Sequence, residues 1–145
     1  MSFSDDIARF TKKTGSNTDV VVRKTVFDIG RRLVERTPVG DADYWKSPPP
    51  KGYVGGHARA NWSHSEGTRI VQELPEIDAS GQASIDRIQK TVSVRAAGKV
   101  HYIQNSVPYI ERLEDGYSRQ APSGMVAVTA AEFQGVISSA IEGLK

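Results

Sequence analysis

Residues 101–124, HYIQNSVPYIERLEDGYSRQAPSG, decide the predicted fold of this 145-residue chain. They predict a strand, a short helix and a polar loop in succession. Residues 99–104 form the strand, with Tyr102 on one face and His101 and Ile103 on the other. Pro108 suits the first turn of the helix that follows, and Gly116 suits a left-handed stop at its end. We expect Tyr109, Ile110 and Leu113 to pack inward from this helix and residues 117–123 to be exposed.

Helical patterns flank this stretch on both sides. Residues 17–36 predict a central helix, because Val22, Val26, Ile29 and Leu33 recur at spacings of three and four. Twenty residues make a helix of about 30 Å, comparable to the diameter of the domain. A shorter helix is expected near residues 2–13, and a last one over residues 128–144. The last helix is expected to lie against the sheet or the central helix through Phe133, Val136, Ile137, Ala140, Ile141 and Leu144.

The middle of the chain has weaker patterns. Residues 57–64 favour a strand with Ala58, Ala60 and Trp62 on one side, and residues 70–74 extend it or pair with it. A short helix over residues 84–89 and a strand over 91–96 follow, the strand forming a hairpin with 99–104. The fold class is therefore α+β: long helices packed on a small, mainly antiparallel sheet, in one domain spanning residues 1–145.

Residues 38–56, PVGDADYWKSPPPKGYVGG, contain four prolines and four glycines and have neither a helical nor a strand period. Loops longer than about 12 residues are uncommon in compact domains unless they are functional. Tyr44, Trp45 and Tyr53 are interleaved in this segment. We interpret it as an arm long enough to reach a neighbouring subunit; the alternative is that its aromatic side chains fold back onto their own domain.

Composition excludes several classes of protein. The chain has no cysteine, which removes disulfides and thiolate chemistry. Its longest apolar runs of three or four residues are far below the roughly 20 that cross a membrane, and its acidic start is unlike a signal peptide. The net charge is +2, but residues 12–36 carry seven basic and three acidic groups (+4), whereas residues 111–145 carry three basic and five acidic groups (−2). These halves either attract between subunits or are solvated faces.

No pattern of catalytic or metal-binding residues is complete. His57, His64 and His101 do not form an HExxH or HxH arrangement, so we expect no metal site. Glu111 and Glu114 share a helix face, as a carboxylate pair would, but a solvated helix end explains them more simply. The glycines of GYVGGH lack a phosphate-binding pattern. We expect neither an enzyme nor a cofactor.

The order of several motifs resembles the small minor tail or neck proteins of tailed bacteriophages. RTPVG at 36–40 is similar to the family's Thr-Pro-Val turn after its first long helix, and ARANW at 58–62 is similar to its Arg-x-x-Trp passage. The aromatic strand, the Asn, the Pro-Tyr pair, Leu-Glu-x-Gly and Ser-x-Gln-Ala-Pro then follow within residues 101–124, before a last helix. Here an insertion follows Gly40, where the family's short version continues with Thr-Gly.

The resemblance implies a structural virion protein assembled in the host cytoplasm. Six subunits would form a ring at the head-to-tail junction or upper end of the tail, joined to connector, terminator or tail-tube proteins, with DNA passing through without sequence-specific binding. One alternative is a tail terminator ring, and another is a nucleic-acid-binding module using the basic surface of residues 12–36. The implied subunit and partner contacts are Tyr44, Trp45, Tyr53, Tyr117, Arg119, Gln120 and Pro122.

Overall fold

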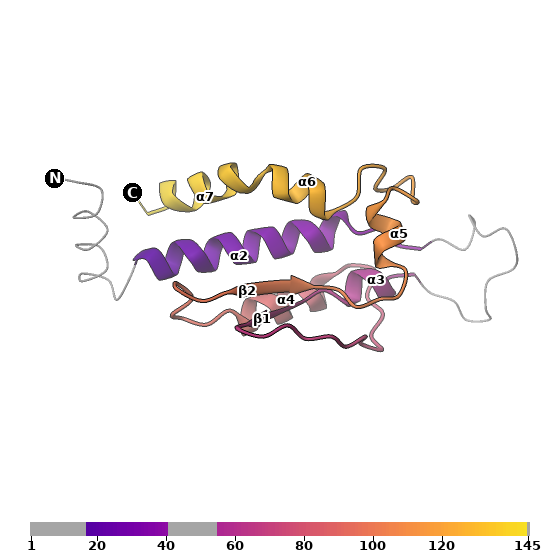
Figure 1. The fold of residues 1–145 in the computed structure, drawn as a ribbon, viewed down its shortest axis with the longest axis horizontal. Helices are drawn as coiled ribbons and strands as arrows, with labels where there is room; N and C mark the ends of the chain where they lie inside the picture. The colour runs from indigo at the N-terminus through magenta and orange to yellow at the C-terminus, as the bar shows by residue number, and fades with distance from the viewer. Residues whose placement is uncertain (1–16, 41–54, 145) are drawn as a thin grey trace, which may run out of the picture.

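The computed structural model describes residues 17–40 and 55–144 and has the α+β fold expected from the sequence (Figure 1). The predicted helix near residues 2–13 and the arm aromatics Tyr44, Trp45 and Tyr53 lie outside the described residues. The elements, in chain order, are α2 (Asn17–Arg36), α3 (His57–Ala60), β1 (Ser63–Glu66), α4 (Gln82–Thr91), β2 (His101–Gln104), α5 (Ile110–Glu114), α6 (Val126–Ala131) and α7 (Phe133–Glu142).

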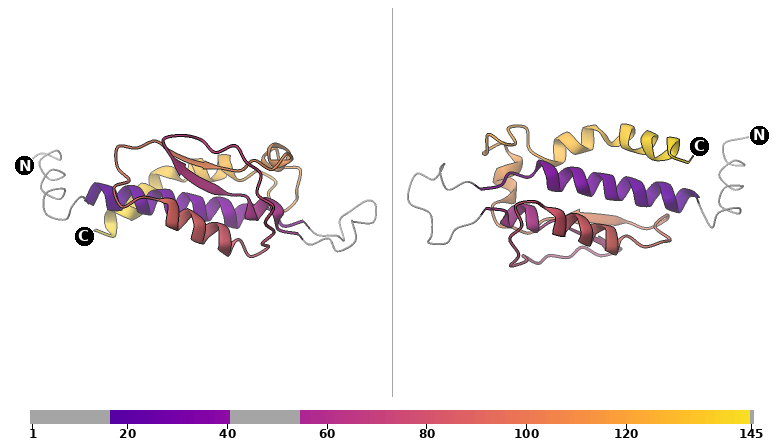
Figure 2. Two further views of the ribbon diagram at one scale, coloured as in Figure 1. Left: turned by 90° about the horizontal axis from the view of Figure 1, so that it is seen from below. Right: turned by 180° about the vertical axis from the view of Figure 1, so that it is seen from behind.

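The helix α2 lies between two layers. The helices α6 and α7 run along one side of it, and α4 with the two strands covers the other side (Figures 1 and 2). The C-terminal helices therefore pack on α2 and not on the sheet. The short helices α3 and α5 lie at the end of the molecule where α2 finishes.

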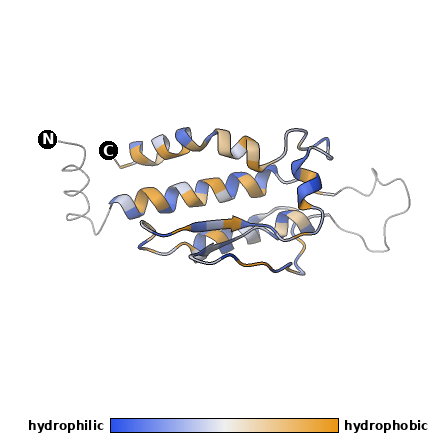
Figure 3. Ribbon diagram, in the orientation of Figure 1, coloured by the Kyte–Doolittle hydropathy of each residue, from blue (hydrophilic) through white to orange (hydrophobic). Residues whose placement is uncertain are grey.

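The main core lies between α2, α4 and the segment that leads into β1. Ile88 is fully buried and packs close to Gly30, where an added Cβ would lie 3.1 Å from two Ile88 carbons. The absence of a side chain at Gly30 lets the two helices approach at this point. Hydrophobic residues recur along the length of α2, as the periodicity predicts (Figure 3). The buried members of this cluster are Leu33, Val34, Trp62, Ile85, Ile88, Ala121 and Met125.

The strands β1 and β2 form a two-stranded antiparallel sheet. Ser63 pairs with Gln104, and Glu66 pairs with His101. On β2, Ile103 packs against the core, whereas Val100, just before the strand, is 60% exposed. The expected strand is thus confirmed over residues 101–104, and the face that it turns toward the core is that of Ile103.

Three strand predictions in the middle of the chain are wrong, and one of them is that for residues 70–74, which lie in no strand. Residues 57–60 form a helical turn and not a strand, although Ala58, Ala60 and Trp62 are buried as expected. Residues 92–100 form no strand, because the N–H groups of Ser93 and Ala97 are bound by side-chain carboxylates of Glu66 and Asp19. These N–H groups are therefore not free to pair with a neighbouring strand, and β2 pairs with β1 instead of with residues 91–96.

Two predictions near the C-terminus also need correction. The single helix expected over residues 128–144 is two helices that meet at Glu132, and Phe133 and Ile141 are 42% and 41% exposed. Tyr109 precedes α5 and is 43% exposed, so it does not pack inward. By contrast, α2 has its predicted bounds, and Gly116 ends α5 with the predicted left-handed backbone at φ +86°.

Candidate functional site

The segments that carry the family resemblance meet at one end of the molecule. Thr37, from RTPVG, and Trp62, from ARANW, are joined by a buried hydrogen bond, in which Trp62 Nε1 donates to Thr37 Oγ1 at 2.7 Å. The Thr37 hydroxyl in turn donates to the backbone oxygen of Leu33 at 2.6 Å. A buried indole N–H needs an acceptor, and this threonine supplies it.

Arg59 strengthens the same junction. Its guanidinium donates to the backbone oxygens of Thr37 and Glu35 at the end of α2 and to that of Ala79. Cations at the last turn of a helix bind its free carbonyl groups favourably. Burial lowers the pKa of Arg59, although the nearby carboxylates of Glu35 and Asp78 favour its charged form. Arg59 thus fixes α3 against the end of α2.

The loop of residues 117–123 is bound through Gln120 to Val39, at the start of the predicted arm. The side-chain amide of Gln120 accepts the N–H of Val39 at 3.0 Å and donates to the Val39 oxygen at 2.8 Å. These two hydrogen bonds resemble the paired backbone hydrogen bonds between neighbouring strands of a β-sheet. Gln120 therefore has an intramolecular role, beside the partner-binding role expected from the sequence.

Glu114 fixes the other end of this loop. Its carboxylate accepts the backbone N–H groups of Met125, Val126 and Ala127 at 2.8 to 3.0 Å, at the start of α6. Burial alone would raise the pKa of Glu114, but these three bonds outweigh it and lower the pKa. Glu114 thus caps the start of α6. The loop packs so closely that a Cβ at Gly124 would lie 2.3 Å from the Glu114 backbone oxygen.

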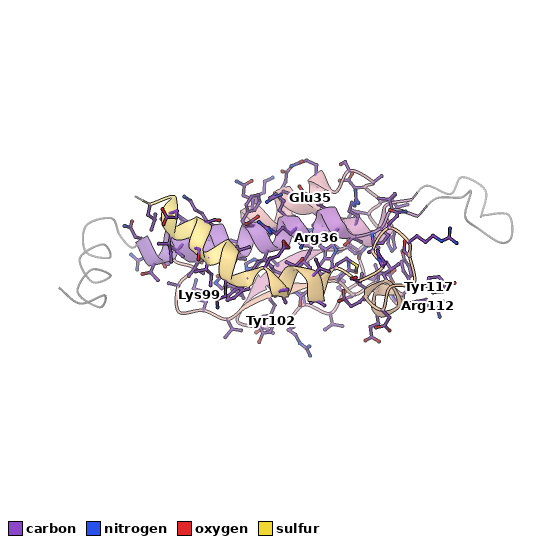
Figure 4. All side chains as sticks on the ribbon, turned by 90° about the horizontal axis from the view of Figure 1, so that it is seen from above. Glu35, Arg36, Lys99, Tyr102, Arg112 and Tyr117 are labelled. Carbon is purple, nitrogen blue, oxygen red and sulfur yellow. The ribbon has the colours of Figure 1, made fainter. Side chains whose placement is uncertain are left out.

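The exposed side of the loop carries most of the expected contact residues. Tyr117 is 72% exposed, and the guanidinium of Arg112 lies 5.3 Å from the centre of its ring (Figure 4). Arg119 and Pro122 are also exposed. A depression of about 450 Å³ lies between the loop and the end of α2, lined by Glu35, Arg36, Thr37, Arg59, Val128 and residues 120–124.

The two ends of the insertion lie side by side at this junction. A Cβ placed on Gly55 would lie 2.0 Å from the backbone oxygen of Gly40. Residues 41–54 therefore leave the described part of the chain and return to it at one place, next to Val39 and Gln120.

An apolar stripe runs along the outer side of α6 and α7. Val126, Phe133 and Ile141 are 48%, 42% and 41% exposed, and their spacings of seven and eight put them on one helical face. Ala130 lies on the same face and is exposed, and Ile137 is half-buried. Met125, Thr129, Val136 and Ala140 occupy a neighbouring face and are buried. The C-terminal helices thus have a buried stripe and an exposed apolar one.

The basic and acidic halves of the sequence meet within the chain. Arg32 donates to the Glu132 carboxylate at 2.8 Å, and Arg36 forms an ion pair with the same carboxylate. Arg31 is bound by Asp28 and Glu35 on α2 itself. Much of the positive charge of α2 is therefore neutralised by carboxylates of the same chain.

Three potential metal ligands lie together on one face of the strand pair. His64 and Glu66 on β1 and His101 on β2 each offer a ligand atom, and these atoms lie within 4.8 Å of one another. Burial lowers the pKa of His64, and the nearby His101 lowers it further. Burial would raise the pKa of Glu66, but bonds from Ser93 and Lys99 lower it to about 2. The HExxH and HxH patterns could not reveal this cluster, because its histidines lie on different strands. The signal in the sequence is the alternate spacing of His64 and Glu66, which puts both on one face of a strand.

Comparison with protein-family profiles, with curated proteins and with solved structures found no match to this chain. Within residues 17–40 and 55–144, no helix combines the length and the apolar character needed to cross a lipid bilayer.

Proposed function

We propose that this chain is a structural subunit of a tailed bacteriophage, forming a ring at the neck or upper end of the tail that joins the head connector to the tail. The observation that carries the proposal is the junction of motifs. Thr37 binds Trp62, Val39 binds Gln120, and Glu114 caps α6. Motifs up to about 80 residues apart therefore form one local structure. A chance resemblance of separate short motifs would not require them to contact one another.

The outer face of the C-terminal helices is the proposed contact between neighbouring subunits. Val126, Phe133 and Ile141 leave a continuous apolar stripe in contact with water. Burial of such a stripe against a second copy would remove apolar area from water, which is the main favourable term in most subunit contacts. Repetition of one such head-to-tail contact closes a ring when the rotation between copies permits it.

The loop of residues 117–123 and the insertion of residues 41–54 are the proposed contacts with the adjacent rings. Both start from the same end of the molecule, and Tyr117, Arg119 and Pro122 are exposed there. Aromatic and arginine side chains dominate the binding energy of many protein interfaces. Tyr44, Trp45 and Tyr53 belong to the insertion and would add further anchors. The role is one of surfaces and needs no catalytic group or cofactor.

The same geometry fits a tail terminator ring, which differs in the neighbours that it contacts. A nucleic-acid-binding role through residues 12–36 is the less favoured alternative. Arg31, Arg32 and Arg36 are bound by carboxylates of the chain itself, so fewer charges remain for phosphates. Duplex binding through this surface would show a steep dependence on salt. A mobility-shift titration at two salt concentrations separates this alternative from DNA passing through a ring.

The decisive experiment examines assembly. Native mass spectrometry and electron microscopy of the purified chain are expected to show closed rings at high concentration. Phe133→Ser with Ile141→Ser is expected to give folded monomers, because both side chains are already partly exposed. Val71→Ser, at an 83% exposed position outside the stripe, is the matched control and is expected to keep the rings.

Assembled particles provide the second half of this test. In the virus that encodes the chain, Tyr44→Ala with Trp45→Ala is expected to leave the subunit folded but to give heads without tails. Overlong tails instead would identify a terminator ring. If particles lacking the protein altogether join heads and tails normally, the proposed function is wrong.

A further inference from the structure

We propose that His64 Nε2, His101 Nδ1 and Glu66 Oε1 bind one divalent transition-metal cation of the Zn²⁺ class on the core-facing side of the strand pair. This site is independent of the proposed neck function. Its ligands come from neighbouring strands, since Glu66 of β1 pairs with His101 of β2 in the sheet register. His64 lies two residues before Glu66 and so points to the same face of β1.

The hydrogen bonds of the two imidazoles place two of their ring nitrogens next to each other within the cluster. The backbone oxygen of Ala96 can only accept, so His101 Nε2, at 2.7 Å from it, carries a hydrogen and His101 Nδ1 is left as an acceptor. The Thr91 hydroxyl has one hydrogen, which it can donate to the Ile88 oxygen at 3.1 Å or to His64 Nδ1 at 2.9 Å. When it donates to Ile88, His64 Nδ1 carries the hydrogen of its contact with Thr91, and His64 Nε2 is left as an acceptor as well.

Each neutral imidazole carries one hydrogen. His64 Nε2 and His101 Nδ1 face each other at 2.9 Å. Without a metal ion, a hydrogen on His64 Nε2 can bridge the two nitrogens. When that hydrogen lies on His64 Nδ1 instead, where Thr91 Oγ1 accepts it, both facing lone pairs are free to bind one cation.

The surroundings favour a metal ion over a proton. Glu66 Oε1 lies 3.9 Å from His101 Nδ1 and adds a third ligand of opposite charge. Two imidazoles and one carboxylate are a common ligand set for zinc, with water in the fourth position. Ligand nitrogens around tetrahedral zinc are about 3.3 Å apart for bonds of about 2.0 Å, so the present 2.9 Å needs a shift of only a few tenths of an ångström.

Each of the three ligands is also held by a second partner. His101 Nε2–H donates to a backbone carbonyl, which is the usual outer contact of a metal-bound histidine. Thr91 orients His64, and the Ser93 N–H and Lys99 Nζ bind the two oxygens of Glu66 at 2.7 and 3.2 Å. His64 is 2% exposed, whereas the side chains of His101 and Glu66 are 10% and 17% exposed. An ion could therefore enter from the side of Glu66. Once bound, it would fasten β1 and the segment around residue 96 to β2.

The first test uses the unaltered chain without an affinity tag. After dialysis against a chelator, Zn²⁺ is added and followed by calorimetry and by nitrogen-15 spectra of the histidine rings. We expect one Zn²⁺ per chain, with shifts of the His64 and His101 resonances and none of His57, whose ring binds Glu73 and the Glu76 backbone oxygen elsewhere. Absence of binding, equal shifts of all three rings, or a shared proton as the only cation would overturn the proposal.

Variants identify the ligands and their orienting group. Glu66→Gln removes the anionic ligand and Thr91→Val removes the contact to His64 Nδ1. Each is expected to weaken Zn²⁺ binding at least about tenfold, the lower end of the loss caused by outer-contact changes at metal sites. Thr91→Ser keeps the hydroxyl and is expected to restore binding, and His57→Gln is the matched histidine control. Equal affinity in all of these variants would show that Zn²⁺ binds elsewhere and the proposal is wrong.

Discussion

The two sides of α2 are held to their neighbours by different forces. Toward α4 the contact is apolar, with Leu33, Val34 and Ile88 in one buried cluster. Toward α7 only small or medium side chains such as Val136 and Ala140 are buried, and the carboxylate of Glu132 is bound by two arginines of α2. The helix α2 thus has a conventional apolar core on the side of α4 and a more ionic, less apolar contact on the side of α7.

This difference indicates how the stability of the molecule is distributed. Burial of large apolar side chains stabilises by about 1.5–3 kcal/mol each, whereas partly exposed ion pairs contribute little and are weakened by salt. The layer of α4 and the strands should therefore form one cooperative unit with α2, and α6 and α7 should open more easily. In the proposed ring, an outer layer that opens or shifts at low cost could adapt to the neighbouring subunit.

The largest effect is expected on the apolar side. Ile88→Ala removes a fully buried side chain next to Gly30 and should lower the free energy of unfolding by about 2–5 kcal/mol. Urea unfolding followed by circular dichroism measures it. Ile141→Ala, on the exposed stripe of α7, is the matched control and should change this free energy by no more than about 0.5 kcal/mol. If both variants lost a similar free energy of unfolding, stability would not be concentrated on the α4 side of α2 as described.

A smaller and pH-dependent effect is expected where the C-terminal layer begins. Glu114→Gln removes the charge that caps α6 and should cost about 1 kcal/mol at pH 7. Because the pKa of Glu114 is lowered in the folded state, its contribution is complete above the unfolded pKa and is lost as the pH falls through the folded pKa.

Unfolding free energies at pH 7 and at several pH values below 4.5 measure this dependence. The difference between the original chain and Glu114→Gln should narrow as the solution becomes more acidic. Glu111→Gln, at an exposed position on the same short helix, provides the control and should show no such convergence. A constant difference at every pH would indicate that Glu114 acts through packing and not through its charge.

The smallest effect is expected at the ionic contact itself. Glu132→Gln should lower the melting temperature slightly in dilute buffer, and the loss should disappear near 1 M salt, where charges are screened within about 3 Å. Hydrogen exchange should become faster in α7 and stay unchanged in α4. The loss caused by Ile88→Ala should persist in high salt. A salt-independent loss at Glu132 would mean that the two sides of α2 do not differ as described.

Local periodicity was sufficient to predict α2, α4 and α5, but not α3, the break between α6 and α7, or the strand pairing. The bounds of α2 follow from its apolar spacing, and α4 contains the helix predicted over residues 84–89. The strand expected at 91–96 is absent because Glu66, 27 residues earlier, binds the Ser93 N–H. The turn at 57–60 depends on contacts of Arg59 with the end of α2. Neither long-range contact has a local signal.

The candidate sites also differ in how far the sequence alone could predict them. The exposed loop containing Tyr117 and Arg119 was predictable because polar residues lie between two helix signals. The double contact of Gln120 with Val39 was not, since it joins residues 81 positions apart. His64 and His101 lie 37 positions apart in the chain, and no spacing pattern in the sequence connects them. Their contact follows from the pairing of β1 with β2, which the sequence did not predict.

The adjacent ends of the insertion, Gly40 and Gly55, make residues 41–54 an exchangeable cassette. Because the two ends already meet, the segment can be shortened, lengthened or replaced with only the small entropy change of resizing a closed loop. If the segment binds adjacent rings as proposed, natural variation in it could change the partner while the helices stay unaltered. For protein engineering, the same position offers a place to insert a foreign peptide or a reporter domain.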